Sequence, residues 1–165
     1  MKRLITFLAI MCLLLPTSTY AAVSNQPINW GFKKAQNEIP PEAGAQYDQI
    51  LAKYGAFYKG DPKSKVLYLT FDSGYENGYM PKILEVLKKE KVPATFFVTG
   101  HFLNSQPELA KQMVKDGHII GNHSWSHPDF TAIGDAKIRE ELQKVKVKAK
   151  EVTGQKEMKY LRPPR

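Results

Sequence analysis

Between residues 66 and 162 the sequence alternates short apolar runs with longer segments of helical periodicity, and this alternation limits the possible folds more than any other feature. The runs are rich in aliphatic and aromatic residues, as buried strands are, and they cover residues 66–71, 94–99, 118–121 and 158–162. The intervening segments place apolar side chains three and four residues apart, as amphipathic helices do. Strands that alternate with helices predict a parallel sheet covered by its crossover helices.

Proline and glycine mark the expected ends of these helices. Pro81 and Pro107 lie in predicted first turns, and Gly117 and Gly154 follow predicted last turns. The longest helix is expected to begin at Asp135, because apolar residues then recur four, three, four and three apart at Ile138, Leu142, Val145, Ala149 and Val152. The chain is therefore predicted to be an α/β protein. A closed β/α barrel needs roughly 250 residues, so we expect part of a larger parallel fold.

The N-terminus has the pattern of a signal peptide, predicted for residues 1–21. A basic start precedes the apolar run 4–15, and the small residues Thr19 and Ala21 fit cleavage after Ala21. The run is too short to span a bilayer comfortably, although an uncleaved membrane anchor is the alternative. Cys12, the single cysteine, lies in this segment. The mature chain is therefore expected to be free of thiols and to be secreted or held in the cell envelope, without a stable membrane span.

The charge of the chain is a formal +8 at neutral pH. An exported basic protein is attracted to polyanions such as cell-wall polymers or anionic lipid headgroups. Nucleic acid is not expected as a partner, because the chain leaves the cell and its lysines are scattered over helix faces. The sequence does not predict an oligomeric state.

Residues 22–64 form a mixed N-terminal extension with one expected helix. Its apolar residues recur at helical spacing, namely Ala43, Tyr47, Ile50, Leu51 and Tyr54. Two interpretations of these and the nearby aromatic residues remain open. They line a sugar-binding groove, or they pack the extension onto the domain that follows, which we prefer.

Five polar residues follow the predicted strand ends: Asp72, His101, His123, His127 and Arg162. Because the carboxyl ends of parallel strands meet at one edge, these residues are expected on the same rim. A His-x3-His pair can converge on one divalent ion if the residues between turn helically. The rim is therefore predicted to hold a metal at His123 and His127, whereas His101 is expected to stabilise a loop.

Three segments carry a resemblance to a known family. Residues 70–74 (Thr-Phe-Asp-Ser-Gly), 123–127 (His-Ser-Trp-Ser-His) and 162–165 (Arg-Pro-Pro-Arg) resemble, in order and spacing, the first three motifs of the polysaccharide deacetylases. This is the carbohydrate esterase family 4 that shares the chitooligosaccharide deacetylase (NodB) homology domain. With residues 28–32 and 71–78 included, the sequence looks like the branch that deacetylates muramic acid residues of peptidoglycan before muramic δ-lactam formation in the spore cortex.

The resemblance covers about residues 65–165 and implies both a fold and a site. It implies the first half of a distorted β/α barrel, incomplete at its C-terminus, acting on peptidoglycan glycan strands with a zinc-like divalent ion. By resemblance, His123 and His127 are the metal ligands, Asp72 is the general base and Arg162 holds that base. A metal ion in such a site lowers the pKa of its water to about 7.

Two features depart from the family pattern. Ser73 stands where the family usually has an aspartate as third metal ligand, so Ser73 is a doubtful third position. The later family motifs, including the histidine expected to act as general acid, would lie beyond Arg165, so the chain itself is expected to be inactive. Two rival functions remain: an inactive glycan-binding barrel fragment, and a glycosidase that uses Asp72 and Glu76 as paired carboxylates.

Overall fold

The computed structural model of the chain describes residues 25–29 and 31–164. The predicted signal peptide, Trp30 and Arg165 lie outside these residues. No helix in the described ranges is both long enough and apolar enough to cross a membrane.

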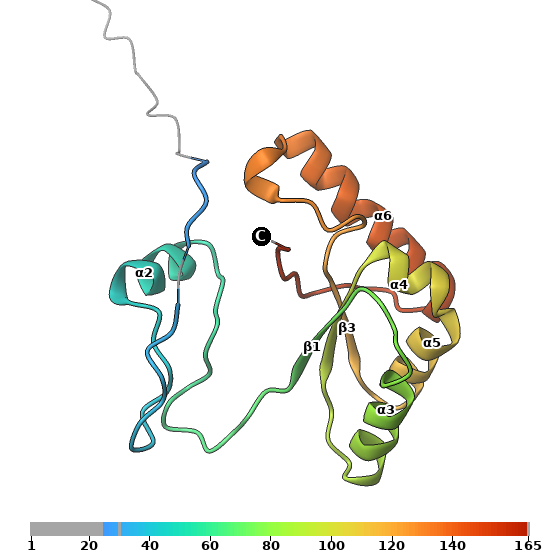
Figure 1. Cartoon of the computed structure of the whole chain (residues 1–165), viewed down its shortest axis with the longest axis horizontal. Helices are drawn as coiled ribbons and strands as arrows, with labels where there is room; N and C mark the ends of the chain where they lie inside the picture. The colour runs from blue at the N-terminus through green and yellow to red at the C-terminus, as the bar shows by residue number, and fades with distance from the viewer. Residues whose placement is uncertain (1–24, 30, 165) are drawn as a thin grey trace, which may run out of the picture.

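The centre of the fold is a parallel three-stranded sheet in the order β1-β2-β3 (Figure 1). The strands are β1 (Thr70–Ser73), β2 (Thr95–Val98) and β3 (Ile119–Asn122). Their register aligns Asp72 with Phe97 and Phe97 with Gly121. Because side chains alternate across a pleated strand, these three residues share one face of the sheet.

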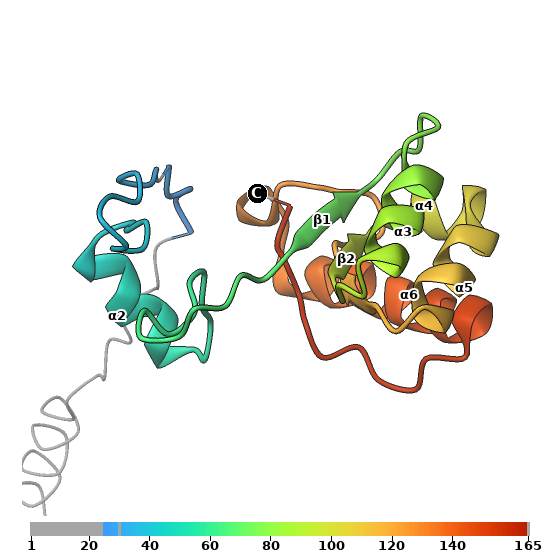
Figure 2. The ribbon, with the colours of Figure 1, turned by 90° about the horizontal axis from the view of Figure 1, so that it is seen from below.

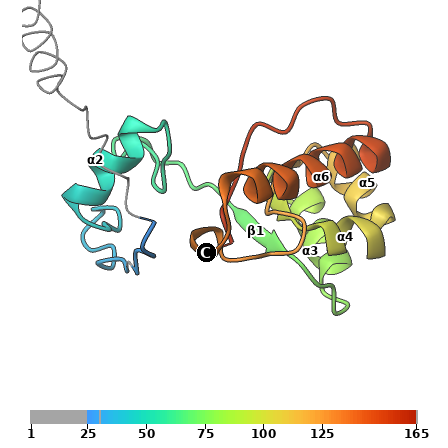
Figure 3. The same ribbon diagram turned by 90° about the horizontal axis from the view of Figure 1, so that it is seen from above.

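The helices gather on the other face of the sheet, while α2 lies apart on the opposite side (Figures 1, 2 and 3). The helical elements are α2 (Ala45–Lys53), α3 (Met80–Lys89), α4 (Gly100–Ser105), α5 (Pro107–Lys115), the short 3-10 helix η2 (Phe130–Ala132) and α6 (Asp135–Thr153). The core lies between helices and sheet, where several side chains are fully buried: Phe96, Val98, Phe102, Met113, Ile120 and Val145. The parallel α/β architecture predicted from the alternation is therefore confirmed.

The first strand begins later than its apolar run predicts. Residues 66–69 form no strand, and Leu67 and Tyr68 are 91% and 74% exposed. The neighbouring strand β2 first pairs at Thr95 with Thr70. Leu69 O still accepts a hydrogen bond from Thr95 N at 3.0 Å, but β2 does not extend further back along the run. The prediction of a strand over 66–71 is therefore wrong in its first four residues.

The predicted fourth strand is also wrong. Within the described residues, the segment 158–162 makes a single parallel bridge to β3, between Asn122 and Leu161. Asn122 N donates to Tyr160 O at 2.9 Å, and Arg162 N donates to Asn122 O at 3.0 Å. The segment thus lies beside β3 in parallel, as expected, but the pairing is too short to be a strand.

Helix α4 was not predicted, because the sequence after Thr99 looks like a loop. Thr99 caps this helix, since its Oγ1 accepts a hydrogen bond from Phe102 N at 3.3 Å. Gly100 begins it directly against Trp125, where a Cβ would lie 2.3 Å from the indole ring. A tertiary contact therefore explains this glycine better than a loop does.

The N-terminal extension has hydrogen bonds and an ion pair of its own, and Asn25 Nδ2 also donates to Thr131 O of the domain at 2.7 Å. Helix α2 buries none of its residues, and Tyr54 is 68% exposed. Tyr58 Oη accepts a hydrogen bond from Ala43 N, and Lys59 pairs with Asp48. In this structure the preferred interpretation, that the aromatic residues of the extension pack it onto the domain, is wrong for the helix.

One buried histidine makes the stability of the domain depend on pH. His118 is 6% exposed, its Nδ1 accepts a hydrogen bond from Ala94 N at 3.2 Å, and burial lowers its pKa below the ordinary 6.5. Above about pH 6.5 the ring is neutral in both the folded and the unfolded chain. As the pH falls below this value, the unfolded chain binds the proton first, so stability is lost down to the lowered pKa of the folded chain.

We therefore expect the midpoint temperature of unfolding to fall between pH 7 and pH 5 in the wild-type chain. His118→Phe should reduce that pH dependence, while the exposed His101→Gln should retain it. Calorimetric unfolding at a series of pH values measures both variants. A His118→Phe variant with the same pH dependence as the wild type would show that another group is responsible.

Candidate functional site

Arg162 connects two of the residues that the sequence predicts for the site. Its Nη1 donates to Asp72 Oδ1 at 2.6 Å, and its Nη2 donates to Thr70 Oγ1 at 2.9 Å. Its backbone carbonyl lies 2.7 Å from His123 Nδ1. The side chain of one residue therefore orients the predicted base while its main chain orients a predicted metal ligand.

The sheet register explains why Arg162 lies where it does. Asp72, Phe97 and Gly121 are neighbours on the face that the helices leave uncovered. The guanidinium of Arg162 lies 4.3 Å from the centroid of the Phe97 ring, a favourable cation–π distance. A Cβ on Gly121 would lie 2.6 Å from that ring. Gly121 therefore makes room for Phe97, and Phe97 supports the arginine that pairs with Asp72.

The two histidines of the predicted metal pair lie side by side. The ring centroids of His123 and His127 are 4.8 Å apart, with the rings nearly perpendicular. Because a carbonyl oxygen can only accept, His123 Nδ1 carries the proton that it shares with Arg162 O. His123 Nε2 is then the nitrogen with a free lone pair, as in the carbonyl-oriented histidine ligands of metal sites.

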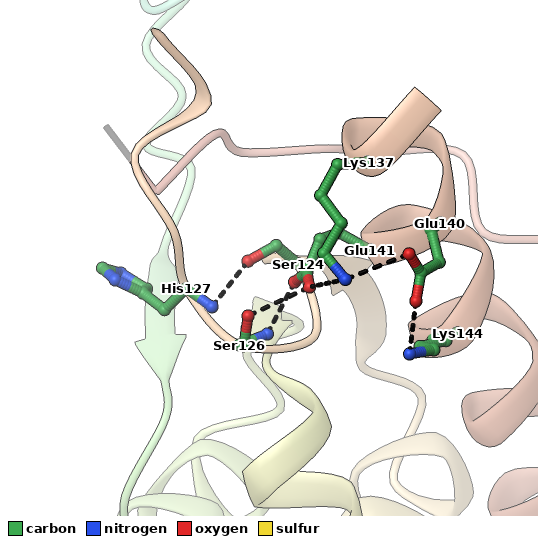
Figure 4. Close-up of polar contacts among 7 residues, drawn as sticks. All are labelled: Ser124, Ser126, His127, Lys137, Glu140, Glu141 and Lys144. Carbon is green, nitrogen blue, oxygen red and sulfur yellow. Dashed lines mark hydrogen bonds and ion pairs between the residues drawn. The ribbon is translucent and has the colours of Figure 1, made fainter. Parts of the chain in front are cut away.

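The loop between the histidines is tightly turned. Ser124 and His127 both have positive φ, of 64° and 58°, a conformation that is uncommon for residues other than glycine. Ser124 Oγ accepts a hydrogen bond from His127 N at 3.0 Å, which closes the turn. In Figure 4 the His127 imidazole points away from α6, the Ser124 hydroxyl faces His127 N, and Ser126 faces Glu141 of the helix.

A divalent metal fits this donor set in part. Two adjacent imidazoles, one with its tautomer set by a carbonyl, are suitable ligands for zinc-like ions. However, among residues 25–29 and 31–164 no three histidine, cysteine, aspartate or glutamate side chains gather closely enough to hold an ion. Among the described residues, the predicted metal ligands that the structure brings together are therefore the two imidazoles of His123 and His127.

Ser73, the doubtful third position, is buried with its hydroxyl unsatisfied. It is 2% exposed, and its Oγ has no hydrogen-bond partner in the described part of the chain. Ser73 follows Asp72 in β1, so the two side chains start on opposite faces of the strand. Buried hydroxyl groups normally have partners, which makes Ser73 an unusual residue at the end of this strand.

Two other candidates do not join the group. His101 lies in α4, exposed, with its ring 4.4 Å from the Tyr75 ring. Glu76 directs both carboxylate oxygens to Met80 N, at 3.2 Å each, and so caps α3. Because this carboxylate serves the helix N-terminus, the paired-carboxylate arrangement of a glycosidase receives no support.

The structure adds site residues that the sequence reasoning missed. Asn122, directly before the first histidine, joins three segments: its Nδ2 donates to Leu142 O and its Oδ1 accepts from Ser124 N. Thr70 supplies the second acceptor for Arg162. In the sequence, Asn122 is a polar residue at a strand end and Thr70 is a polar residue two positions before Asp72. Such residues are common at strand ends, so their positions do not identify them as site residues.

Comparison with known proteins shows which proteins this chain resembles. Residues 59–165 match the family model described as polysaccharide deacetylase. The peptidoglycan-N-acetylmuramic acid deacetylase PdaA of Bacillus subtilis is 56% identical over 144 residues, which are 87% of this chain and 55% of that protein. Its solved structure, a family 4 carbohydrate esterase, has a TM-score of 0.82 and 55% identity over 86% of this chain and 61% of the solved chain.

Two further proteins are similar. A family 4 carbohydrate esterase structure from Bacillus anthracis has a TM-score of 0.79 and 58% identity, over 87% of this chain and 65% of that chain. A peptidoglycan-N-acetylglucosamine deacetylase of Bacillus cereus is 34% identical over 69% of this chain and 41% of its own length. The chain spans about half the length of the curated relatives that it matches.

Proposed function

The chain belongs to the polysaccharide deacetylase family, and from this membership we propose that it contributes the base and metal-binding part of a hydrolase acting on peptidoglycan. The reaction removes N-acetyl groups from amino sugars, with N-acetylmuramic acid as the expected substrate. The observation that carries the proposal is the double role of Arg162, which pairs with Asp72 at 2.6 Å and with His123 at 2.7 Å. This contact links a carboxylate from β1 to a histidine that follows β3.

The residues have distinct roles in the proposed reaction. Asp72 accepts a proton from the attacking water, and the adjacent guanidinium of Arg162 keeps its carboxylate oriented. His123 and His127 provide the nitrogens that would hold a divalent ion. Such an ion, when bound, supplies the Lewis acidity that lowers the pKa of a water molecule. The general acid for the leaving amine is not assigned to any described residue.

The finer biological assignments are part of the same proposal. Similarity to the Bacillus subtilis protein, whose name specifies N-acetylmuramic acid, supports a muramic substrate. The more distant Bacillus cereus protein is named for N-acetylglucosamine. We extend the proposal to muramic δ-lactam formation in the spore cortex, and to export with cleavage after Ala21, which sequencing the N-terminus of the exported protein tests.

Acetate release from peptidoglycan is the direct test. Because the relatives are longer, the assay uses a chimera in which the C-terminal portion of the Bacillus subtilis deacetylase follows residue 164 of this chain. We expect the chimera to release acetate from glycan strands carrying N-acetylmuramic acid faster than from strands carrying N-acetylglucosamine alone. We expect no release by the chain by itself. A chimera that folds and binds Zn²⁺ but releases no acetate would contradict the proposed activity.

An inactive glycan-binding fragment is the second candidate, and it is favoured by the absence of a third carboxylate ligand in the described residues. It predicts that peptidoglycan binds to the chimera without acetate release. Binding and hydrolysis measured on the same preparation separate the two candidates.

Ser73→Asp tests whether this position limits metal binding. We expect the variant to raise Zn²⁺ affinity about tenfold, equivalent to about 1.4 kcal/mol, because an ionised carboxylate is a stronger ligand than a hydroxyl. Without metal the variant should unfold at lower temperature, since its carboxylate replaces a buried, unpartnered hydroxyl. Thermal unfolding with and without Zn²⁺ measures both effects. Ser73→Asn, which adds similar volume without charge, is the control; equal affinity in both variants would contradict the prediction.

A further inference from the structure

Glu141 is a carboxylate in the protein core that the proposed reaction does not use. It lies on α6 and is 2% exposed, and it precedes the buried Val145 and Ala149 by about one and two helical turns. The nearest cation among the described ion pairs is Lys137 Nζ, 3.8 Å from Glu141 Oε1. A charged group is costly to bury unless hydrogen bonds satisfy it. The partners of Glu141 therefore indicate what this position does.

Both hydrogen bonds that the described residues make to the Glu141 carboxylate come from the loop between the two histidines. Ser126 N donates to Glu141 Oε2 at 2.7 Å, and Ser126 Oγ donates to Oε1 at 3.0 Å. Ser126 immediately precedes His127. Figure 4 shows both contacts on the side of the loop that faces α6, with the His127 ring on the other side. The carboxylate thus holds the residue next to a predicted metal ligand by two bonds.

The same helix also fixes the other end of the loop. Asn122 Nδ2 donates to Leu142 O at 2.9 Å, and Asn122 Oδ1 accepts from Ser124 N at 3.0 Å. Leu142 is the neighbour of Glu141 in α6. Leu142 and Glu141, two adjacent residues of one helix, therefore hold the loop before and after Trp125. The part of the loop that they hold contains Ser124 and His127, which have positive φ angles.

We propose that Glu141 is a positioning residue for the His123–His127 pair, acting through Ser126 to keep the His127 imidazole beside that of His123. The proposal rests on the proposed function in treating these histidines as metal ligands. Loss of the two bonds would free the turn that carries His127, while His123 would stay anchored by Arg162 O. Glu141 therefore sets the spacing of the two nitrogens, and the predicted consequence is a change in metal affinity.

The chain offers a matched control on the same helix turn. Glu140 is also a glutamate of α6, but its carboxylate is 45% exposed and pairs with Lys137 and Lys144 at 3.0 and 2.6 Å. It makes no described contact with the loop. Substitutions at residues 140 and 141 remove the same charge from the same helix, so a difference between them reports the contact with Ser126.

The experiment measures Zn²⁺ binding to the full chain by competition with a chromophoric chelator. Glu141→Leu fills a similar volume with an apolar side chain but removes both hydrogen bonds to Ser126. We expect this variant to weaken Zn²⁺ binding about 10- to 100-fold, as loss of an outer-shell partner does. Glu141→Gln should retain most of the affinity, because its amide can accept from Ser126 N and donate to Ser126 Oγ. Glu140→Leu should bind as the wild type does. If Glu141 only filled the core, Glu141→Leu would also bind as the wild type does, which would overturn the proposal.

A metal-free measurement separates this proposal from the proposed function. Amide hydrogen exchange at Ser126 and His127 should accelerate in Glu141→Leu and stay unchanged in Glu140→Leu. If the wild type binds no Zn²⁺, the proposed metal site fails, and unchanged exchange in Glu141→Leu would overturn the positioning role as well. If Glu141→Leu does not fold, Ser126→Ala is used in its place. It removes the hydrogen bond between Ser126 Oγ and Glu141 by changing Ser126, the exposed residue of the two. Affinity and His127 exchange both equal to the wild type in that variant would overturn the proposal.

Discussion

Asp72→Asn is expected to lower acetate release by the chimera about 10²- to 10⁴-fold, the usual contribution of a general base. The asparagine oxygen can still accept the hydrogen bond from Arg162 Nη1, so the local geometry should be retained. The amide cannot take up a proton from water at neutral pH, which removes the function without removing the contact. Zn²⁺ affinity should stay within about twofold of the wild type, because Asp72 is paired with Arg162 and not with the histidines.

Glu76→Gln is the matched control for Asp72→Asn. The release of acetate and the release of new reducing ends are both measured. Glu76 caps α3 through Met80 N, so we expect a small loss of stability and little change in rate. A rate for Asp72→Asn within a few-fold of the wild type would remove Asp72 as the base. New reducing ends that depend on both residues would instead favour the glycosidase.

Replacing either histidine by alanine should abolish metal retention. The loss of a direct ligand should exceed the 10- to 100-fold effect of losing an outer-shell partner, and acetate release should disappear with it. The two variants should differ in stability. His123 is 4% exposed and bonded to Arg162 O, so His123→Ala should also loosen the C-terminal segment, whereas the exposed His127 makes no such bond among the described contacts.

Elemental analysis after dialysis, followed by thermal unfolding of the metal-free proteins, measures these effects. His101→Ala is the control, since His101 lies in α4 beside Tyr75. Metal content equal to the wild type in both His123→Ala and His127→Ala would contradict the site. Loss of metal in His101→Ala as well would point to a different set of ligands.

Much of the local structure follows from the sequence because its causes are local. The spacing of apolar residues and the terminal Gly154 predict α6 from Asp135 to Thr153, which the structure confirms. Proline in the first turn correctly predicts the beginnings of α3 and α5. Parallel pairing also follows, since each strand is joined to the next through a helix, and it brings residues after β1 and β3 to one edge of the sheet.

The sequence could not define which residues of each apolar run pair with a neighbouring strand. The run at residues 66–69 has the composition of a strand, but a strand also needs a partner, and β2 begins opposite Thr70. The segment 158–162 has the same composition and pairs at a single bridge. Whether an apolar run becomes a strand depends on its neighbours in space, which composition does not record.

The site shows the same division between local pattern and tertiary contact. The sequence by itself predicted that Asp72, His123, His127 and Arg162 lie at one edge of a parallel sheet. Only the tertiary structure decided that Arg162 bridges Asp72 and His123, and that Glu141 turns inward while Glu140 beside it faces solvent. The side-chain hydrogen bonds of Arg162 and Glu141 join residues from 15 to 92 positions apart. They depend on side-chain direction and burial, which are properties of the packed chain.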